Sequence, residues 1–368
     1  MLPNIEPAHQ LSSYCSDGRL LIIAEGFEKR ALSWIQQQPP QVLFSQSIIC
    51  KYEPEQRGQF DEVYAEVKSR SSDDPIVLPY NRFDPTQFEH CFEGFGDYSS
   101  FSEIIIDISV MSKLLIMIII HVLRNYSGRI VIVYTEPKTW SPSEAEYKEY
   151  VRKNTEGYSC VGLSSVGVYD IVKTPGLSSI VMQDSQPKLI TFTSSNEHLL
   201  VAILNEVAPA STLLINAKNE REPWRATAAL EIHQKVIDSF GIKDRVECYD
   251  LLDYKRVFTQ LVQEYTQNCY TNRIILAPTG GKIHTLACAL LKACCSDIHI
   301  EYPTPESYVF ESYSSEEIEG IHEVIFTGFK DFLNQLRIDY NLDGLSTFLF
   351  TAHLKNEHVH LKRRTCSK

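Results

Sequence analysis

The chain has 368 residues, of which 43% are hydrophobic and 22% charged, and this composition excludes collagen-like, low-complexity and disordered proteins. At roughly 100–200 residues per domain, the length predicts two domains. The 47 Asp and Glu outnumber the 35 Lys and Arg and give a net charge of −12, which disfavours binding to duplex nucleic acid and confines small anions to local pockets.

The N-terminal sequence and the cysteines predict a cytoplasmic protein. Residues 1–6 contain neither the basic nor the apolar region of a secretory signal. The 10 cysteines are scattered through apolar stretches without a C-x-x-C pair, which indicates reduced thiols in the core. The apolar stretch 104–123 is as long as a membrane span, but Asp107, Lys113 and His121 interrupt it. We therefore expect a buried strand and a buried helix there, with no membrane contact.

Strands and helices alternate along the first half of the sequence. Apolar runs rich in Ile, Val and Leu predict strands over 19–24, 42–50, 75–79, 103–109 and 129–134. Helical spacing predicts helices over 25–36, 59–70, 88–95 and 111–124. Strands without polar alternation are covered on both faces, as in parallel sheets, so this half is predicted to be a doubly wound, Rossmann-like unit.

The second half follows the same order of elements. Its predicted strands are 188–193, 212–216, 245–249, 274–277 and 297–302. Its predicted helices are 197–207, 224–240, 257–266 and one that begins at Lys282. Tyr134 and Tyr302 are 168 residues apart, and Lys113 and Lys282 are 169 apart. This correspondence predicts an internal duplication.

The predicted fold is α/β, with two tandem Rossmann-like, doubly wound parallel-sheet units and a C-terminal helix/hairpin extension. The first unit spans 1–140 and the second 187–312, joined by 141–186 with a helix over 142–151 and a hairpin insertion around 167–172. The extension 313–368 is predicted to hold a helix over 316–337 and hairpin strands over 347–354 and 358–362.

The turn 278–282 of the second half is the main candidate for anion binding. Gly280 and Gly281 allow close approach of the backbone, the following helix offers N–H groups, and Thr279 and Lys282 can contact phosphate oxygens. The spacing matches neither G-x-x-x-x-G-K-[ST] nor G-x-G-x-x-G. The structural alternative is a tight turn with a solvated lysine.

The corresponding turn of the first half carries hydroxyl groups in place of glycines. Asp107, Ser109, Ser112 and Lys113 lie there, and helix capping is the alternative explanation for them. Ligands of doubly wound sheets bind at the carboxyl ends of the strands. We therefore expect the two turns to face each other across a pseudo-twofold axis and form one pocket for a ligand with more than one phosphate.

Further candidates follow other strands. Asn216 and Arg225 lie after the second strand of the second half, where Arg225 and Trp224 could bind a phosphate or stack on a base, or pack at the surface. Candidate general acids or bases are Glu25, Asp107 and Glu136. The sequence predicts no cofactor and no metal site.

The two turns resemble CARF domains and their duplicated relatives, the SAVED domains. The resemblance rests on Pro-Thr-Gly-Gly-Lys at 278–282 and Asp-Ile-Ser at 107–109, each before a helix, and covers most of 19–310 in architecture. Those families are Rossmann-like sensors of cyclic oligonucleotides in prokaryotic antiviral systems, and they bind their ligand across two units. The resemblance implies a nucleotide sensor that signals to a separate effector protein, because no nuclease, protease or membrane effector is recognisable in the chain.

Three functions follow from these observations. The first is a sensor of a phosphorylated nucleotide or cyclic oligonucleotide with a partner protein. The second is a transferase or hydrolase that processes nucleotides or phosphosugars in the same cleft. The third is a non-catalytic assembly protein.

Overall fold

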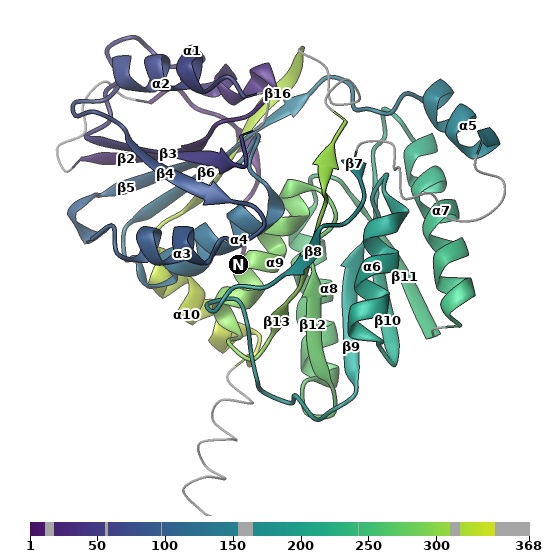
Figure 1. The fold of residues 1–368 in the computed structure, drawn as a ribbon. Coiled ribbons are helices and arrows are strands. Elements are labelled where there is room, and N and C mark those ends of the chain that lie inside the picture. Colours follow the sequence, from purple (N-terminus) through teal and green to yellow (C-terminus); the bar gives the residue numbers. More distant parts are fainter. Residues whose placement is uncertain are drawn as a thin grey trace, which may run out of the picture.

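The chain forms two large sheets, each built on five parallel strands, that lie side by side in the computed structural model (Figure 1). The structure describes residues 1–11, 18–55, 58–96, 98–153, 165–241, 243–309 and 317–342. The predicted Rossmann-like α/β fold is confirmed. The predicted hairpin over 347–362 lies outside the described residues.

The first sheet, within the described residues, has the strand order β1-β16-β6-β5-β2-β3-β4. Its parallel strands are β2 (Arg19–Ala24), β3 (Gln46–Glu53), β4 (Ile76–Asn81), β5 (Glu103–Asp107) and β6 (Arg129–Pro137). The sheet continues beyond β6 with β16 (Ile318–Phe326), which is antiparallel to β6, and then with β1 (Glu6–Pro7), which is antiparallel to β16. Its helical segments are η1 (Lys29–Ala31), α1 (Ser33–Gln37), α2 (Phe60–Ser69), α3 (Thr86–Glu93), η2 (Tyr98–Ser100), α4 (Lys113–Val122) and η3 (Leu123–Asn125).

The second sheet has the order β11-β10-β9-β12-β13 and is parallel throughout. Its strands are β9 (Pro187–Phe192), β10 (Ser211–Lys218), β11 (Lys243–Asp250), β12 (Arg273–Ala277) and β13 (His299–Ile300). The helices of this half are α6 (Glu197–Val207), α7 (Trp224–Phe240), α8 (Tyr254–Asn268) and α9 (Lys282–Cys294), while α5 (Glu144–Lys153) precedes the sheet and α10 (Phe329–Asp339) follows it.

Both sheets arrange their parallel strands in the same way. When the five parallel strands of each unit are numbered along the chain, their spatial order across the sheet is 3-2-1-4-5. Successive strands are added toward one edge up to the third and toward the other edge from the fourth. The switch point therefore lies between the first and fourth strands, which are β2 and β5 in one unit and β9 and β12 in the other. Ligands of such sheets bind outside the carboxyl ends of these strands. The duplication itself and the boundaries after residues 140, 186 and 312 stay predictions.

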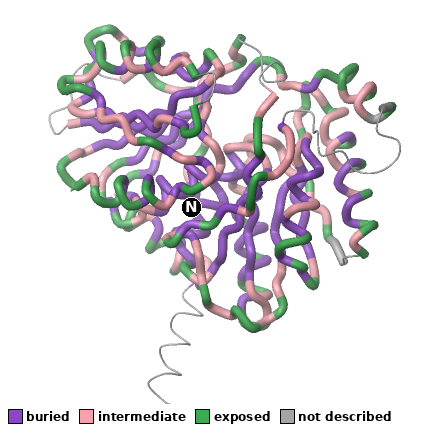
Figure 2. Tube along the Cα trace, viewed as in Figure 1, coloured by how far each residue is buried: buried purple, intermediate pink, exposed green. Residues whose placement is uncertain are grey.

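Helices α4 and α9 pack against each other between the two sheets and join the units into one core. The described residues 114–121 of α4 and 283–294 of α9 are all buried, and Figure 2 shows burial concentrated in the sheets and these helices. An apolar helix of this kind needs protein on every side. No helix in the described part of the chain has both the length and the apolar composition needed to cross a bilayer.

The predicted helix over 316–337 is wrong in its first half. Residues Ile318–Phe326 form β16, which pairs antiparallel with β6, and the helix α10 begins at Phe329. Several apolar residues of this stretch recur at helical spacing, but they are β-branched and suit a strand that completes an open sheet edge. Pairing with β6 therefore prevails over the helical pattern.

Two shorter predictions also need correction. The stretch 25–36 contains a loop with η1 and the five-residue α1, not one continuous helix. The expected hairpin around 167–172 does not pair with itself: β7 (Ser165–Val166) pairs with β15 (Ser307–Tyr308), and β8 (Asp170–Val172) pairs with β14 (Tyr302–Thr304). The segment after β13 thus supplies the partner strands that a hairpin would have supplied locally.

Candidate functional site

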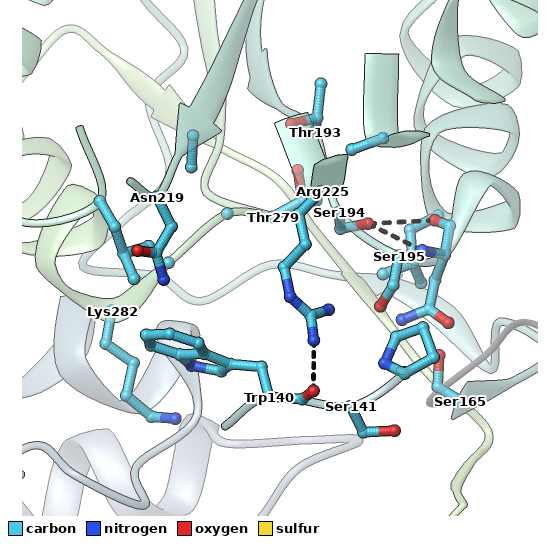
Figure 3. A pocket seen from close by; sticks show the side chains of 18 of the residues that line it. Trp140, Ser141, Ser165, Thr193, Ser194, Ser195, Asn219, Arg225, Thr279 and Lys282 are labelled. Carbon is cyan, nitrogen blue, oxygen red and sulfur yellow. Dashed lines mark hydrogen bonds between the residues drawn. The ribbon is translucent and has the colours of Figure 1, made fainter. Parts of the chain in front are cut away.

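A cavity of about 300 Å³ lies where the two units meet, at the carboxyl ends of the strands. The first unit contributes Glu28, Arg30, Lys113, Tyr134 and Trp140 to its wall, and the connecting segment contributes residues that include Tyr147 of α5. The second unit contributes the turns after β9, β10 and β12, the first turns of α7, and residues around β14 and β15. The wall therefore combines residues that are far apart in the sequence (Figure 3).

Lys113 and Lys282 both line this cavity and begin the two central helices, α4 and α9. Neither ammonium group has a hydrogen bond or ion pair with any residue that the structure describes. Burial lowers the pKa of both lysines, and burial together with the charge of Arg30 lowers the pKa of Lys282 to about 7. The N-termini of the two helices add positive potential at the same place.

Arg30 adds a third cation to this part of the wall. The Nε and Nη2 of Arg30 donate to the two carboxylate oxygens of Glu28 at 3.0 and 2.9 Å, and its Nη1 donates to the Thr135 carbonyl at 2.8 Å. These bonds fix the guanidinium, which is 5% exposed. Glu28 balances one of the three positive charges, so the site remains cationic and suits an anion with several oxygens. We refer to three of the cationic side chains that line the cavity, Lys113, Lys282 and Arg30, as the cationic floor.

The turn 278–282 is shaped by contacts within the second unit. The Thr279 hydroxyl donates to the Phe192 carbonyl at 2.6 Å and so joins the ends of β9 and β12. A Cβ on Gly280 would lie 2.7 Å from the Phe192 Cβ, so only glycine fits there. Thr279, Gly280, Gly281 and Lys282 all line the cavity. The hydroxyl of Thr279 is engaged by backbone, whereas the Lys282 ammonium is available to a ligand.

The other ligand-binding candidates of the second unit have different environments. Arg225 lines the cavity, but its guanidinium donates to Glu222 at 2.7 Å and to the Trp140 carbonyl, and lies 4.6 Å from the Trp224 ring. Asn216 is buried and does not line the cavity; its amide accepts from Thr193 at 2.7 Å and donates to Ala226 at 2.9 Å. Asn216 therefore links the end of β9 to the start of α7 and does not contact the cavity.

The polar side chains of Asp107, Ser109 and Ser112, which precede α4, bind backbone groups of the protein and do not line the cavity. The Ser109 hydroxyl accepts from the Thr135 N–H at 2.8 Å and is fully buried. Asp107 accepts from the Ser109 N–H at 2.9 Å, and its Oδ2 has no hydrogen-bond partner among the described residues. Burial raises the pKa of Asp107 to about 6. The Ser112 hydroxyl accepts from the Leu115 N–H at 3.2 Å and caps α4.

We expect Ser112→Ala to destabilise the protein by about 1 kcal/mol without weakening ligand binding, because the lost hydroxyl caps a helix and does not face the cavity. Urea denaturation measures the free energy of unfolding. Ser112→Asn retains a capping oxygen and should restore most of the loss. A tenfold weaker affinity for phosphorylated ligands in Ser112→Ala, with unchanged stability, would instead identify the hydroxyl as a ligand contact.

The candidate acids and bases are engaged by the protein and do not line the cavity. Glu25 is 3% exposed and accepts from the Tyr52 N–H at 2.7 Å; burial raises its pKa. Glu136 pairs with Arg221 and accepts from His322 Nε2 at 2.9 Å. With Asp107 also behind the wall, none of the three carboxylates is placed to exchange a proton with a ligand in this cavity.

The sequence did not identify Trp140 or Tyr308 as cavity residues. Arg30 lies in η1, where a continuous helix over 25–36 was expected, and this short turn places its side chain in the buried cavity wall. Trp140 and Tyr308 follow the fifth strands of the two units, 168 residues apart. The repeat offset already visible in Tyr134 and Tyr302 would have indicated this pair.

No protein-family model matches the chain, and no curated protein matches its sequence. Among solved structures it is similar to a type III CRISPR defence DNA nuclease activated by cyclic oligoadenylate, at 8% identity and a TM-score of 0.46, over 82% of this chain and 68% of that one. It is also similar to the cytoplasmic domain of a prokaryotic cation chloride cotransporter, at 8% identity and a TM-score of 0.23, over 81% of this chain and 99% of that one. None of these likenesses assigns an activity to the chain.

Proposed function

We propose that the chain is a sensor that binds a phosphorylated, nucleotide-type ligand between its two units and signals to a partner protein. The observation that carries this proposal is the pair Lys113 and Lys282, which begin α4 and α9 and line one cavity without a described hydrogen-bond or ion-pair partner. Half-buried cations without partners are costly, and an anionic ligand offsets that cost. The aromatic wall residues Tyr134, Trp140 and Trp224 suit the base of a nucleotide.

The resemblance of the two turns to CARF and SAVED domains gives this proposal its most specific form. In that form the ligand is a cyclic oligonucleotide, and the partner is an effector protein of a prokaryotic antiviral system. The enzymatic alternative has less support, because Glu25, Asp107 and Glu136 do not line the cavity. The assembly alternative leaves the cationic floor without a role.

We expect Lys282→Met to weaken binding of phosphorylated ligands at least tenfold, because a charge-assisted hydrogen bond in a buried site is lost. Isothermal titration calorimetry with pyrophosphate, ATP and cyclic oligonucleotides measures the effect. Lys330→Met is the matched control, since Lys330 is an exposed residue of α10 outside the cavity.

Each outcome of this experiment selects one function. Binding that depends on Lys282, with the ligand recovered intact by chromatography, supports the sensor. Conversion of the ligand to product would favour the enzyme. If no phosphorylated compound binds, or if Lys330→Met weakens binding as much as Lys282→Met, the proposal is wrong.

A further inference from the structure

Two aromatic side chains, one from each unit, line the same cavity. Trp140 follows β6 and Tyr308 lies in β15, after β13, with an offset of 168 residues. Tyr134 and Tyr302, which have the same offset, line the cavity as well. The cavity therefore presents one ring from each unit, together with the lysines of the cationic floor.

The second unit holds the loop of Trp140 in place. Arg221 Nη1 donates to the Lys138 carbonyl at 3.3 Å, and its guanidinium lies 5.1 Å from the centre of the Trp140 ring. Arg225 donates to the carbonyl of Trp140 itself. In Figure 3 the Trp140 indole and the Lys282 side chain project into the same part of the cavity.

The first unit contacts the segment just before Tyr308 in a similar manner. Arg82, which follows β4, donates to the carbonyls of Pro305 and Glu306. Its guanidinium lies 5.5 Å from the centre of the Tyr308 ring. Each ring thus has an arginine of the opposite unit close to it, and that arginine donates to a backbone carbonyl two or three residues before the ring. A ring held in advance loses little conformational entropy when a second planar group stacks on it.

We propose that Trp140 and Tyr308 are two base-stacking platforms, and that the ligand carries two nucleobases joined through phosphate groups. One base stacks on each ring, and the phosphates lie at Lys113 and Lys282. This inference rests on the proposed function, because it needs the cationic floor to bind phosphate. Linear and cyclic dinucleotides share the required chemistry, and the experiment separates them.

Calorimetry on the full chain tests this assignment with four sets of probes: linear homodinucleotides, cyclic homodinucleotides, the mononucleotides and pyrophosphate. At least one dinucleotide should bind tenfold or more tightly than every mononucleotide. Trp140→Ala and Tyr308→Ala should each weaken that dinucleotide about tenfold, as expected for loss of one stacked base, and leave pyrophosphate binding unchanged. Tyr270→Ala removes an exposed ring outside the cavity and is the matched control.

A conservative variant separates stacking from a change in the loop. Trp140→Phe keeps a ring and should retain most of the affinity, while the quenching of tryptophan fluorescence expected on dinucleotide binding should be weaker than in the wild type, with Trp224 as the remaining tryptophan of the cavity wall. Equal affinity for mononucleotides and dinucleotides, or unchanged dinucleotide affinity in both alanine variants, would overturn the two-platform assignment and leave the sensor proposal standing. If neither pyrophosphate nor any nucleotide binds, the proposed function itself fails.

Discussion

The double variant Lys113→Met, Lys282→Met is expected to lose at least hundredfold in affinity for pyrophosphate and to melt at a higher temperature than the wild type. The affinity falls because each lysine would supply a charge-assisted hydrogen bond to the anion, and the two losses combine. The free protein gains stability because burial lowers the pKa of both lysines, which means that the fold disfavours their charged forms. Methionine has a similar shape and carries no charge.

Calorimetry and thermal denaturation without ligand measure the two effects of this double variant. A stabilisation of 1 kcal/mol raises the Tm of a chain of this size by about 2–4 °C. Lys148→Met combined with Lys330→Met removes the same charge from exposed positions and should change neither quantity appreciably. Reduced binding together with a lowered Tm would mean that the two lysines support the fold, and would contradict their assignment as ligand groups.

Ligand affinity is expected to fall as the pH rises above 7, by up to about tenfold per pH unit. Burial and the charge of Arg30 lower the pKa of Lys282 to about 7, so its ammonium loses its proton near neutral pH in the absence of ligand. A bound phosphate stabilises the charged form and raises this pKa. Binding above pH 7 must then take up a proton, which calorimetry in buffers of different ionisation enthalpy detects directly.

The same lysine predicts the opposite trend for stability without ligand. Between pH 7 and its ordinary pKa of 10.5, the unfolded chain holds a proton on Lys282 that the folded protein has released. The free energy of unfolding should therefore rise with pH in this window, and the cost of burying the charge is fully present below pH 7. Lys282→Met should remove both trends, and comparison with this variant cancels the ionisation of pyrophosphate. Parallel pH profiles of the two proteins would contradict the assignment.

The parallel strands and the central helices could be predicted because their signals are local. The apolar run before Asp107 and the unbroken apolar stretch after Lys113 describe a buried strand and a buried helix whatever surrounds them. β16 could not be predicted in this way. Its residues become a strand because the distant β6 offers an unpaired edge, and that edge is invisible in a local pattern.

The site was predictable to the extent that it follows from topology. The switch points of two similar sheets indicated the turns of Lys113 and Lys282, and both lysines line one cavity. Whether a polar side chain faces a ligand or the protein depends on contacts across the fold. Ser109 and Asn216 satisfy backbone and side-chain groups of neighbouring strands, and no pattern in the sequence distinguishes them from wall residues.

The packing of α4 against α9 has a consequence for how the cavity comes to exist. Each helix is buried on all sides, so one half of the chain on its own would leave its central helix exposed to water and could cover it only by pairing with another molecule. A cavity assembled from two separate chains would then be complete only at concentrations above the dissociation constant of the pair. Because both units lie in one chain, that dependence is absent, and the cavity is complete in every folded molecule, however dilute the protein is.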